Sequence, residues 1–212
     1  MKQKKSKPGG GGRARPDHYA RLAKKEGHAA RSVYKLKEIQ QKYRILKPGG
    51  TVLDLGCAPG SWLDYAARIA GPSGRVIGVD VKPVEIDLSE NAHIFQSDAN
   101  DLPEEAWALI DQGVDAVMSD MAPSTTGRKE VDAARSLQLC EMALYTADRA
   151  LCPGGAFVCK IFQGSDFKAF TEAVRRRFDT SKIFKPQSCR KESKEIYVIG
   201  MGKKQEETDG GT

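Results

Sequence analysis

Three aspartates stand where apolar segments of the sequence end, and their carboxylates are the first groups that could do chemistry. Asp54 lies near the end of the run 51–55, Asp80 closes the run 75–80, and Asp98 follows the short run 93–96. Such runs predict buried parallel strands, whose carboxyl ends meet along one edge of a sheet. Carboxylates gathered there can attract a cation and accept hydrogen bonds from sugar hydroxyls or a base amino group.

A glycine-rich turn follows Asp54 and leads into a helical pattern near residue 61. Turns of this kind bring backbone close to a ligand. A dinucleotide site requires G-x-G-x-x-G, because the second glycine lets the backbone approach a pyrophosphate. Here that position is Ala58, and the following proline lacks an N–H donor. The turn contributes the candidate ligand-binding residues Gly56, Pro59, Gly60 and Trp62.

The loop is poor in donors and has an acidic residue beneath it, which suits a cationic cofactor that carries an amino acid. Asp80 follows Gly60 by twenty residues, where a carboxylate can accept hydrogen bonds from both ribose hydroxyls. Asp98 is expected to face an adenine amino group. These residues predict S-adenosylmethionine as the cofactor and disfavour a dinucleotide.

Lys160 lies inside the apolar run 156–162, and Asp120 closes the run 114–120. The plain interpretation is a lysine whose stem packs in the strand while its ammonium pairs with a carboxylate. Burial favours the neutral amine and a nearby carboxylate favours the ammonium, so a lysine held between these effects can serve as a general base. An acceptor that must lose a proton without forming a covalent adduct is a hydroxyl.

The segment 119–127, SDMAPSTTG, argues against two other acceptors. It lacks the Asn/Asp-Pro-Pro-aromatic loop that stacks a flipped base for amino methylation. A cytosine-C5 enzyme would need a nucleophilic cysteine after the proline, and this chain has Ser124 there.

The elements that must position these residues alternate along the chain, which predicts an α/β fold with a mostly parallel sheet covered by helices on both faces. The last two strands are joined by a loop too short for a parallel crossover, so they are expected to pair antiparallel at one edge. The expected strands are 51–55, 75–80, 93–96, 114–120, 156–162, 180–185 and 195–201, and the expected helices are 17–43, 61–69, 103–111, 131–151 and 166–178.

Charge is distributed unevenly along the 212 residues. Residues 1–44 contain 14 Lys/Arg against 3 Asp/Glu, whereas residues 45–167 contain 9 against 18, and residues 168–204 contain 11 against 4. Basic ends around an acidic middle indicate that the termini meet a polyanion such as RNA, although solvated lysines alone would give the same pattern. We expect a disordered basic Gly-rich arm over 1–16, one domain over 17–204 and a flexible acidic tail over 205–212.

The sequence shows no apolar stretch of membrane-spanning length and no signal peptide, which predicts a cytoplasmic protein without a membrane partner. The five cysteines include no C-x-x-C pair, so neither a zinc site nor another metal site is expected.

Five motifs together resemble the FtsJ (RlmE-type) family of large-subunit ribosomal RNA 2′-O-methyltransferases. The resemblance runs from about residue 17 to residue 203, through RSVYKLKEIQ, DLGCAPGSW, SDMAPS, CPGGAFVCKIFQG and KESKEIYVIG. It implies a Rossmann-like class I methyltransferase fold with a seven-stranded sheet and an antiparallel edge strand. The Gly-rich arm, the acidic tail and Cys57 (often alanine) depart from the family pattern.

By this resemblance, the family's Lys-Asp-Lys-Glu catalytic tetrad falls on Lys35, Asp120, Lys160 and Glu195. Its positions for the S-adenosylmethionine cofactor fall on Gly60, Trp62, Asp80, Asp98 and Asp120. The implied substrate is a uridine ribose in the A-loop of 23S rRNA, within the large ribosomal subunit or a late precursor. We expect a monomer that uses no metal.

Three alternatives stay open at this stage. A cap-type 2′-O-methyltransferase shares the tetrad but usually has an aromatic cap-stacking insertion. A small-molecule O-methyltransferase would not explain the basic termini. A non-catalytic assembly factor with this fold would have no need of an intact tetrad.

Overall fold

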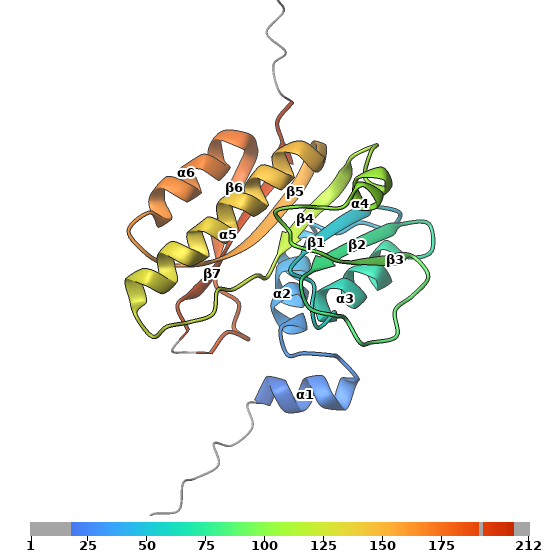
Figure 1. Ribbon diagram of the computed structural model, residues 1–212, viewed down its shortest axis with the longest axis horizontal. Helices are drawn as coiled ribbons and strands as arrows, with labels where there is room; N and C mark the ends of the chain where they lie inside the picture. The colour runs from blue at the N-terminus through green and yellow to red at the C-terminus, as the bar shows by residue number, and fades with distance from the viewer. Residues whose placement is uncertain (1–17, 191–192, 206–212) are drawn as a thin grey trace, which may run out of the picture.

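The strands of the protein form one sheet, in which the order of the strands in space differs from their order along the chain. The computed structural model describes residues 18–190 and 193–205, so the expected arm over 1–16 and nearly all of the expected tail lie outside the described residues. Within the described part, seven strands lie in the order β3-β2-β1-β4-β5-β7-β6 (Figure 1). They are β1 (Thr51–Leu55), β2 (Arg75–Asp80), β3 (Ala92–Gln96), β4 (Val114–Ser119), β5 (Leu151–Phe162), β6 (Phe178–Phe184) and β7 (Glu195–Lys203).

The strands from β3 to β5 run parallel, and β7 pairs antiparallel with both β5 and β6. The predicted α/β class, the mostly parallel seven-stranded sheet and the antiparallel pairing of the last two strands are confirmed. The strand that runs against the others is β7, and it lies one place in from the edge, which β6 forms.

Helices cover both faces of the sheet, as predicted. The helices are α1 (His18–Glu26), α2 (Val33–Tyr43), α3 (Ser61–Ala70), α4 (Glu104–Leu109), α5 (Lys129–Ala150) and α6 (Phe167–Arg177). The apolar side chains of α2 and α3 pack on one face, and those of α4, α5 and α6 pack on the other. Within the described residues, no helix is both long and apolar enough to cross a membrane.

The first helical segment is divided, although the pattern over 17–43 predicted a continuous one. Gly27 has φ of +73°, which ends α1, and the chain turns before α2 begins. The N–H of His28 then donates to the carbonyl of Ala23 at 2.9 Å, which satisfies a carbonyl at the end of α1. Two other bounds also differ: α5 begins at Lys129, and β5 begins at Leu151 with a shift of register before residue 156.

The order of the strands fixes where a ligand can bind. The chain goes from β1 to β2 and β3 on one side and then returns to β4 on the other side. In open α/β sheets, ligands bind beyond the carboxyl ends of the strands at this switch point. Asp54 pairs with Met118 across β1 and β4, and Asp120 follows the end of β4.

Phe157 illustrates how closely the core between the sheet and its outer helices is packed. Its side chain is fully buried on β5, and its ring stacks on that of Phe178 with centroids 6.0 Å apart. We expect Phe157→Ala to lower the free energy of unfolding in urea by about 3–5 kcal/mol, because it leaves a cavity in a packed core. The half-exposed Ile183 is the control, and Ile183→Ala should cost less than about 1 kcal/mol. Equal costs for both variants would contradict this account of the core.

Candidate active site

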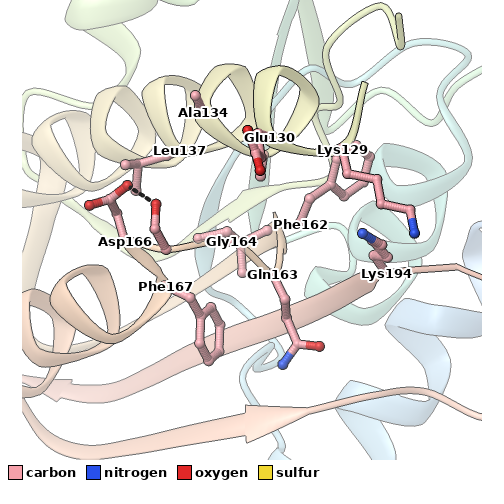
Figure 2. Close-up of a pocket in the computed structure, with 13 residues that line it drawn as sticks. Lys129, Glu130, Ala134, Leu137, Phe162, Gln163, Gly164, Asp166, Phe167 and Lys194 are labelled. Atoms are coloured by element: carbon pink, nitrogen blue, oxygen red, sulfur yellow. Dashed lines mark hydrogen bonds between the residues drawn. The ribbon is translucent and has the colours of Figure 1, made fainter. Parts of the chain in front are cut away.

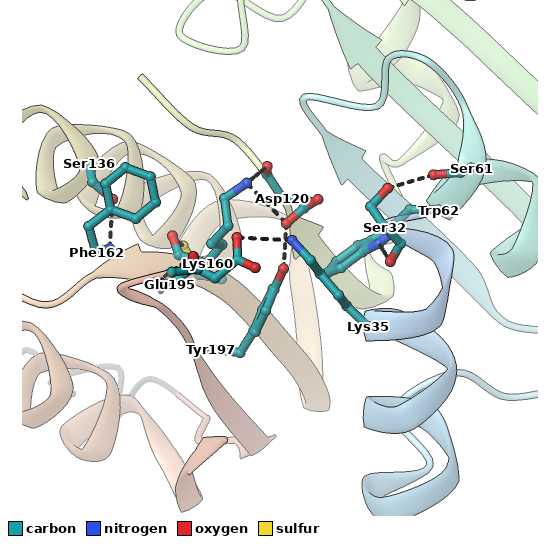
Figure 3. Close-up of polar contacts among 12 residues, drawn as sticks. Ser32, Lys35, Ser61, Trp62, Asp120, Ser136, Lys160, Phe162, Glu195 and Tyr197 are labelled. Carbon is teal, nitrogen blue, oxygen red and sulfur yellow. Dashed lines mark hydrogen bonds and ion pairs between the residues drawn. The ribbon is translucent and has the colours of Figure 1, made fainter. Parts of the chain in front are cut away.

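Two ion pairs lie side by side where the carboxyl end of β5 meets α2 (Figure 3). Lys160 Nζ is 3.1 Å from Asp120 Oδ1 and also donates to the backbone carbonyl of Asp120. Lys35 Nζ is 3.0 Å from Glu195 Oε2. Both lysines are at least nine-tenths buried, so the carboxylates compensate much of the cost of removing their charges from water. The structure therefore brings together Lys35, Asp120, Lys160 and Glu195 from four separate elements.

Tyr197 ties this group to the sheet. Its hydroxyl donates to Asp120 Oδ1 at 2.6 Å, and its ring lies fully buried on β7. Burial, followed by the nearby Asp120 carboxylate, raises the pKa of Tyr197 well above its usual value. The hydroxyl therefore stays protonated and keeps donating, which fixes the Asp120 carboxylate from a second strand.

The helix that carries Lys35 is joined to the glycine-rich turn by Trp62. The Trp62 indole stacks on the Tyr197 ring at 5.8 Å, and its Nε1–H donates to the Ser32 carbonyl at 2.9 Å. The hydroxyls of Ser32 and Ser61 lie 2.8 Å apart. These contacts set α2 against the start of α3, and so place Lys35 relative to the turn.

Asp54 is a buried carboxylate whose two oxygens have no hydrogen-bond partner among the described residues. Burial raises its pKa well above the usual value, and the neighbouring Asp120 and Asp80 carboxylates raise it further. A buried polar group without a partner costs stability, so it points to a role outside folding. A cationic ligand group at this position would supply the missing partner.

A cavity of about 370 Å³ opens beyond the ends of β1, β2 and β4. Four of the predicted ligand-binding residues line it, namely Gly56, Asp80, Asp98 and Asp120. Asp80 accepts hydrogen bonds from the N–H groups of Ala58 and Lys82 at 2.9 and 2.8 Å. Asp98 accepts from the backbone and side chain of Asn100, both at 2.8 Å, and these bonds lower its pKa.

Gly60 shapes the turn without lining this cavity. It has φ of +103°, and a Cβ there would lie 2.7 Å from Ile86 Cδ1 and 2.8 Å from Val84 Cγ1. A side chain at this position would therefore clash as well as strain the backbone. Pro59 follows a cis peptide bond and is exposed, while Trp62 is buried against α2. These three predicted residues border the turn, and their direct contact with a cofactor stays a prediction.

A second cavity, of about 520 Å³, lies beside the Lys35–Glu195 pair. Arg31 and Arg190 stand on its rim, together with Ser32 and Ser193. The tetrad thus lies between two open spaces: Asp120 faces the first, and Lys35 and Glu195 face the second. Such a layout can hold two substrates, one on each side of the tetrad.

Two residues that support the site were missed by sequence reasoning. Tyr197 lies two residues after Glu195 on the same strand, so the alternation of side chains would have placed both on one face. Glu38 accepts hydrogen bonds from the N–H groups of Gln187 and Ser188 at 2.6 and 2.9 Å, which joins α2 to the loop before β7. No local pattern identifies a contact between residues this far apart in the chain.

Residues 29–203 match the family described as FtsJ-like methyltransferase, which is most of the chain. The chain belongs to the FtsJ-like methyltransferase family. The resemblance drawn from the motifs is confirmed, and the catalytic tetrad and cofactor positions inferred from it stay predictions.

Relatives of this FtsJ-like methyltransferase agree with that assignment. It is 56% identical over 188 residues to the ribosomal RNA large subunit methyltransferase E of Desulforapulum autotrophicum, covering 89% of this chain and 93% of the relative. It is 50% identical over 192 residues to the protein of that name from Bdellovibrio bacteriovorus, covering 89% and 97%. A Plasmodium falciparum crystal structure, assigned as a ribosomal RNA methyltransferase, has a TM-score of 0.74 and 25% identity, covering 83% and 98%.

The raised pKa of Asp54 predicts how stability depends on pH in the ligand-free FtsJ-like methyltransferase. Between the ordinary aspartate pKa of 3.8 and the higher folded value, the folded protein binds more protons than the unfolded chain. The contribution of Asp54 to stability should therefore fall by about 1.4 kcal/mol per pH unit in this window as the pH rises. Asp54→Asn lacks this titration, so its stability relative to the wild type should increase between pH 5 and pH 8.

Urea denaturation at both pH values measures this difference. The exposed Asp111 provides a matched control, because Asp111→Asn removes a carboxylate without removing a buried one. A stability difference between Asp54→Asn and the wild type that stays constant with pH would contradict the prediction.

Proposed function

We propose that this methyltransferase moves a methyl group from S-adenosylmethionine to the 2′-hydroxyl of a uridine in the A-loop of 23S rRNA. The acceptor would be the large ribosomal subunit or a late precursor. The relatives named above as ribosomal RNA large subunit methyltransferases support the RNA substrate. The observation that carries the proposal is the buried Lys160–Asp120 pair at the switch point, between the two cavities.

The residues present are suited to S-adenosylmethionine. Asp54 does not line the cavity, but its two buried carboxylate oxygens have no partner among the described residues, and the cofactor carries a sulfonium and an ammonium. Asp80 can accept hydrogen bonds from ribose hydroxyls, and Asp98 can accept one from an adenine amino group. When bound, the cofactor supplies an electrophilic methyl group.

The acceptor side of the reaction requires a group that removes a proton from a hydroxyl. In this proposal Lys160 Nζ, in its neutral form, would take the proton of the 2′-hydroxyl, and the methyl group that a bound S-adenosylmethionine would supply would pass from sulfur to that oxygen, leaving the thioether S-adenosylhomocysteine. Asp120 holds Nζ through its carboxylate and its carbonyl, so the lysine does not need to reorganise during the step. Lys35 and Glu195 orient the ribose from the second cavity and adjust the field at Lys160.

Basic side chains near the second cavity suit an RNA backbone. Arg31 and Arg190 stand on its rim, and α1 carries Arg21, Lys24 and Lys25 close by in the chain. Lys37 is already engaged, since its Nζ is 3.2 Å from Glu26 Oε2 and 2.8 Å from His28 Nε2. Lys191, which follows Arg190 in the chain, falls outside the described residues.

Lys160→Met tests the general base, because it keeps the length of the side chain and removes the amine. We expect kcat for methyl transfer to fall at least about a hundredfold. The dissociation constant of S-adenosylmethionine, measured by calorimetry, should change by less than about threefold. Appreciable turnover in this variant would contradict the assigned role.

Lys203 offers a matched control for that variant. It is an equally buried lysine, and its Nζ is 2.7 Å from Asp148 Oδ1. Lys203→Met should lower the melting temperature but leave kcat within about twofold, because β7 ends far from the tetrad. A loss of kcat equal to that of Lys160→Met would show that any buried lysine gives the effect.

The substrate is tested by methylation with labelled S-adenosylmethionine of large subunits isolated from cells that lack this activity. We expect one labelled uridine in the A-loop, which reverse transcription at low nucleotide concentration locates. Free 23S rRNA should be tested in parallel. Label on a base, or label found only on small molecules, would overturn the proposal.

A further inference from the structure

A third cavity, of about 400 Å³, lies between the first turns of α5 and the segment that joins β5 to α6 (Figure 2). Its size is in the range of pockets that hold small ligands. Apolar side chains form much of its wall, namely Ala133, Ala134, Leu137, Ile161, Phe162 and Phe167. None of the tetrad residues or predicted cofactor residues lines it.

Two lysines stand at one end of this cavity. Figure 2 shows the ammonium groups of Lys129, from the start of α5, and Lys194, from the loop before β7, turned toward each other. Neither ammonium is paired with a carboxylate among the described residues. Like charges that face each other repel, so an anion between them would be stabilised by both.

The other polar side chains that line the cavity are Glu130, Gln163, Ser165 and Asp166, of which Glu130 and Asp166 carry the opposite charge. The Glu130 side chain extends from α5 into the space, some way from the two ammonium groups (Figure 2). A free anion would be repelled by Glu130 and Asp166 and would make no use of the apolar wall. A nucleotide matches the two lysines, the acidic side chains and the apolar wall. Its phosphate is an anion, its hydroxyl and amino groups donate hydrogen bonds, and its base has an apolar face.

The cavity adjoins the active site at the end of the sheet. Phe162 pairs with Glu195 in the β5–β7 register, and the N–H of Gln163 donates to the carbonyl of Lys194 at 3.4 Å. Lys194 lines this cavity, whereas the next residue, Glu195, lines the cavity beside the tetrad. The two cavities therefore meet at consecutive residues of one strand end.

We propose that this cavity binds an unpaired nucleotide of the RNA that flanks the methylated one, with its phosphate between Lys129 and Lys194 and its base against the apolar wall. The inference rests on the proposed function, since it requires an RNA substrate. It adds a nucleotide-binding site on the opposite face of the strand end from the acceptor ribose.

Kinetics on undermethylated large subunits test the cavity with two variants. Lys129→Gln combined with Lys194→Gln removes the phosphate contact, and Ala134→Phe fills the cavity without changing charge. Each should raise KM for the subunit about tenfold, with kcat within about twofold and unchanged binding of S-adenosylmethionine. Melting temperatures establish that the variants fold.

Matched controls remove the same charge or add the same ring elsewhere. Lys47 and Lys182 are exposed lysines outside the cavity, so Lys47→Gln combined with Lys182→Gln should change KM less than twofold. Gln138 is an exposed residue of α5 outside the cavity, and Gln138→Phe should behave likewise. Cavity variants that match these controls, or that lower kcat at constant KM, would overturn the inference.

A photoreactive benzoylphenylalanine in place of Phe167 gives an independent measurement. Irradiation in complex with the large subunit should cross-link to a nucleotide within two positions of the methylated uridine. Cross-linking to a ribosomal protein, or to distant RNA only, would overturn the inference while leaving the proposed function intact. If the wild type transfers no methyl group to RNA, the proposed function itself fails.

Discussion

The candidate site depends on one carboxylate, Asp120, which receives hydrogen-bond donors from two neighbouring strands. Tyr197 on β7 donates a hydroxyl to it, and Lys160 on β5 donates an ammonium. Because Asp120 itself follows β4, this single group connects three strands at the same end of the sheet. A carboxylate largely removed from water is costly unless such donors surround it, so the sheet order and the charge arrangement depend on each other.

The opposite situation holds at Asp54, which lies near enough to Asp120 for the Asp120 carboxylate to raise its pKa. Asp120 has its partners within the fold, whereas the Asp54 oxygens have none among the described residues. The switch point thus combines one satisfied carboxylate with one that is left for a ligand. The unpartnered Asp54 carboxyl lowers the stability of the folded protein, which is typical of sites that bind and orient charged groups.

Sequence reasoning located the main groups because they break local rules. Two such features are visible without any tertiary information: a lysine within an apolar run, and a glycine-rich turn after a strand that contains an aspartate. Both lie at the site. Tyr197 was missed because a tyrosine in an apolar strand is typical of a core residue. The contacts of Glu38 with residues about 150 positions away have no local signature. The position of β7 inside the sheet was also out of reach, since a short connection predicts pairing but not which strand lies at the edge.

The place of β7 has a consequence for the order in which the protein can be completed during synthesis. β6 leaves the ribosome before β7, yet β6 pairs only with β7 within the sheet. Until residues 195–203 emerge, β6 has no neighbour, Asp120 lacks its hydroxyl donor and Lys35 lacks its carboxylate. The four tetrad residues therefore cannot come together in the nascent chain until its last strand, β7, is inserted. Completion of the sheet and assembly of the site are one event.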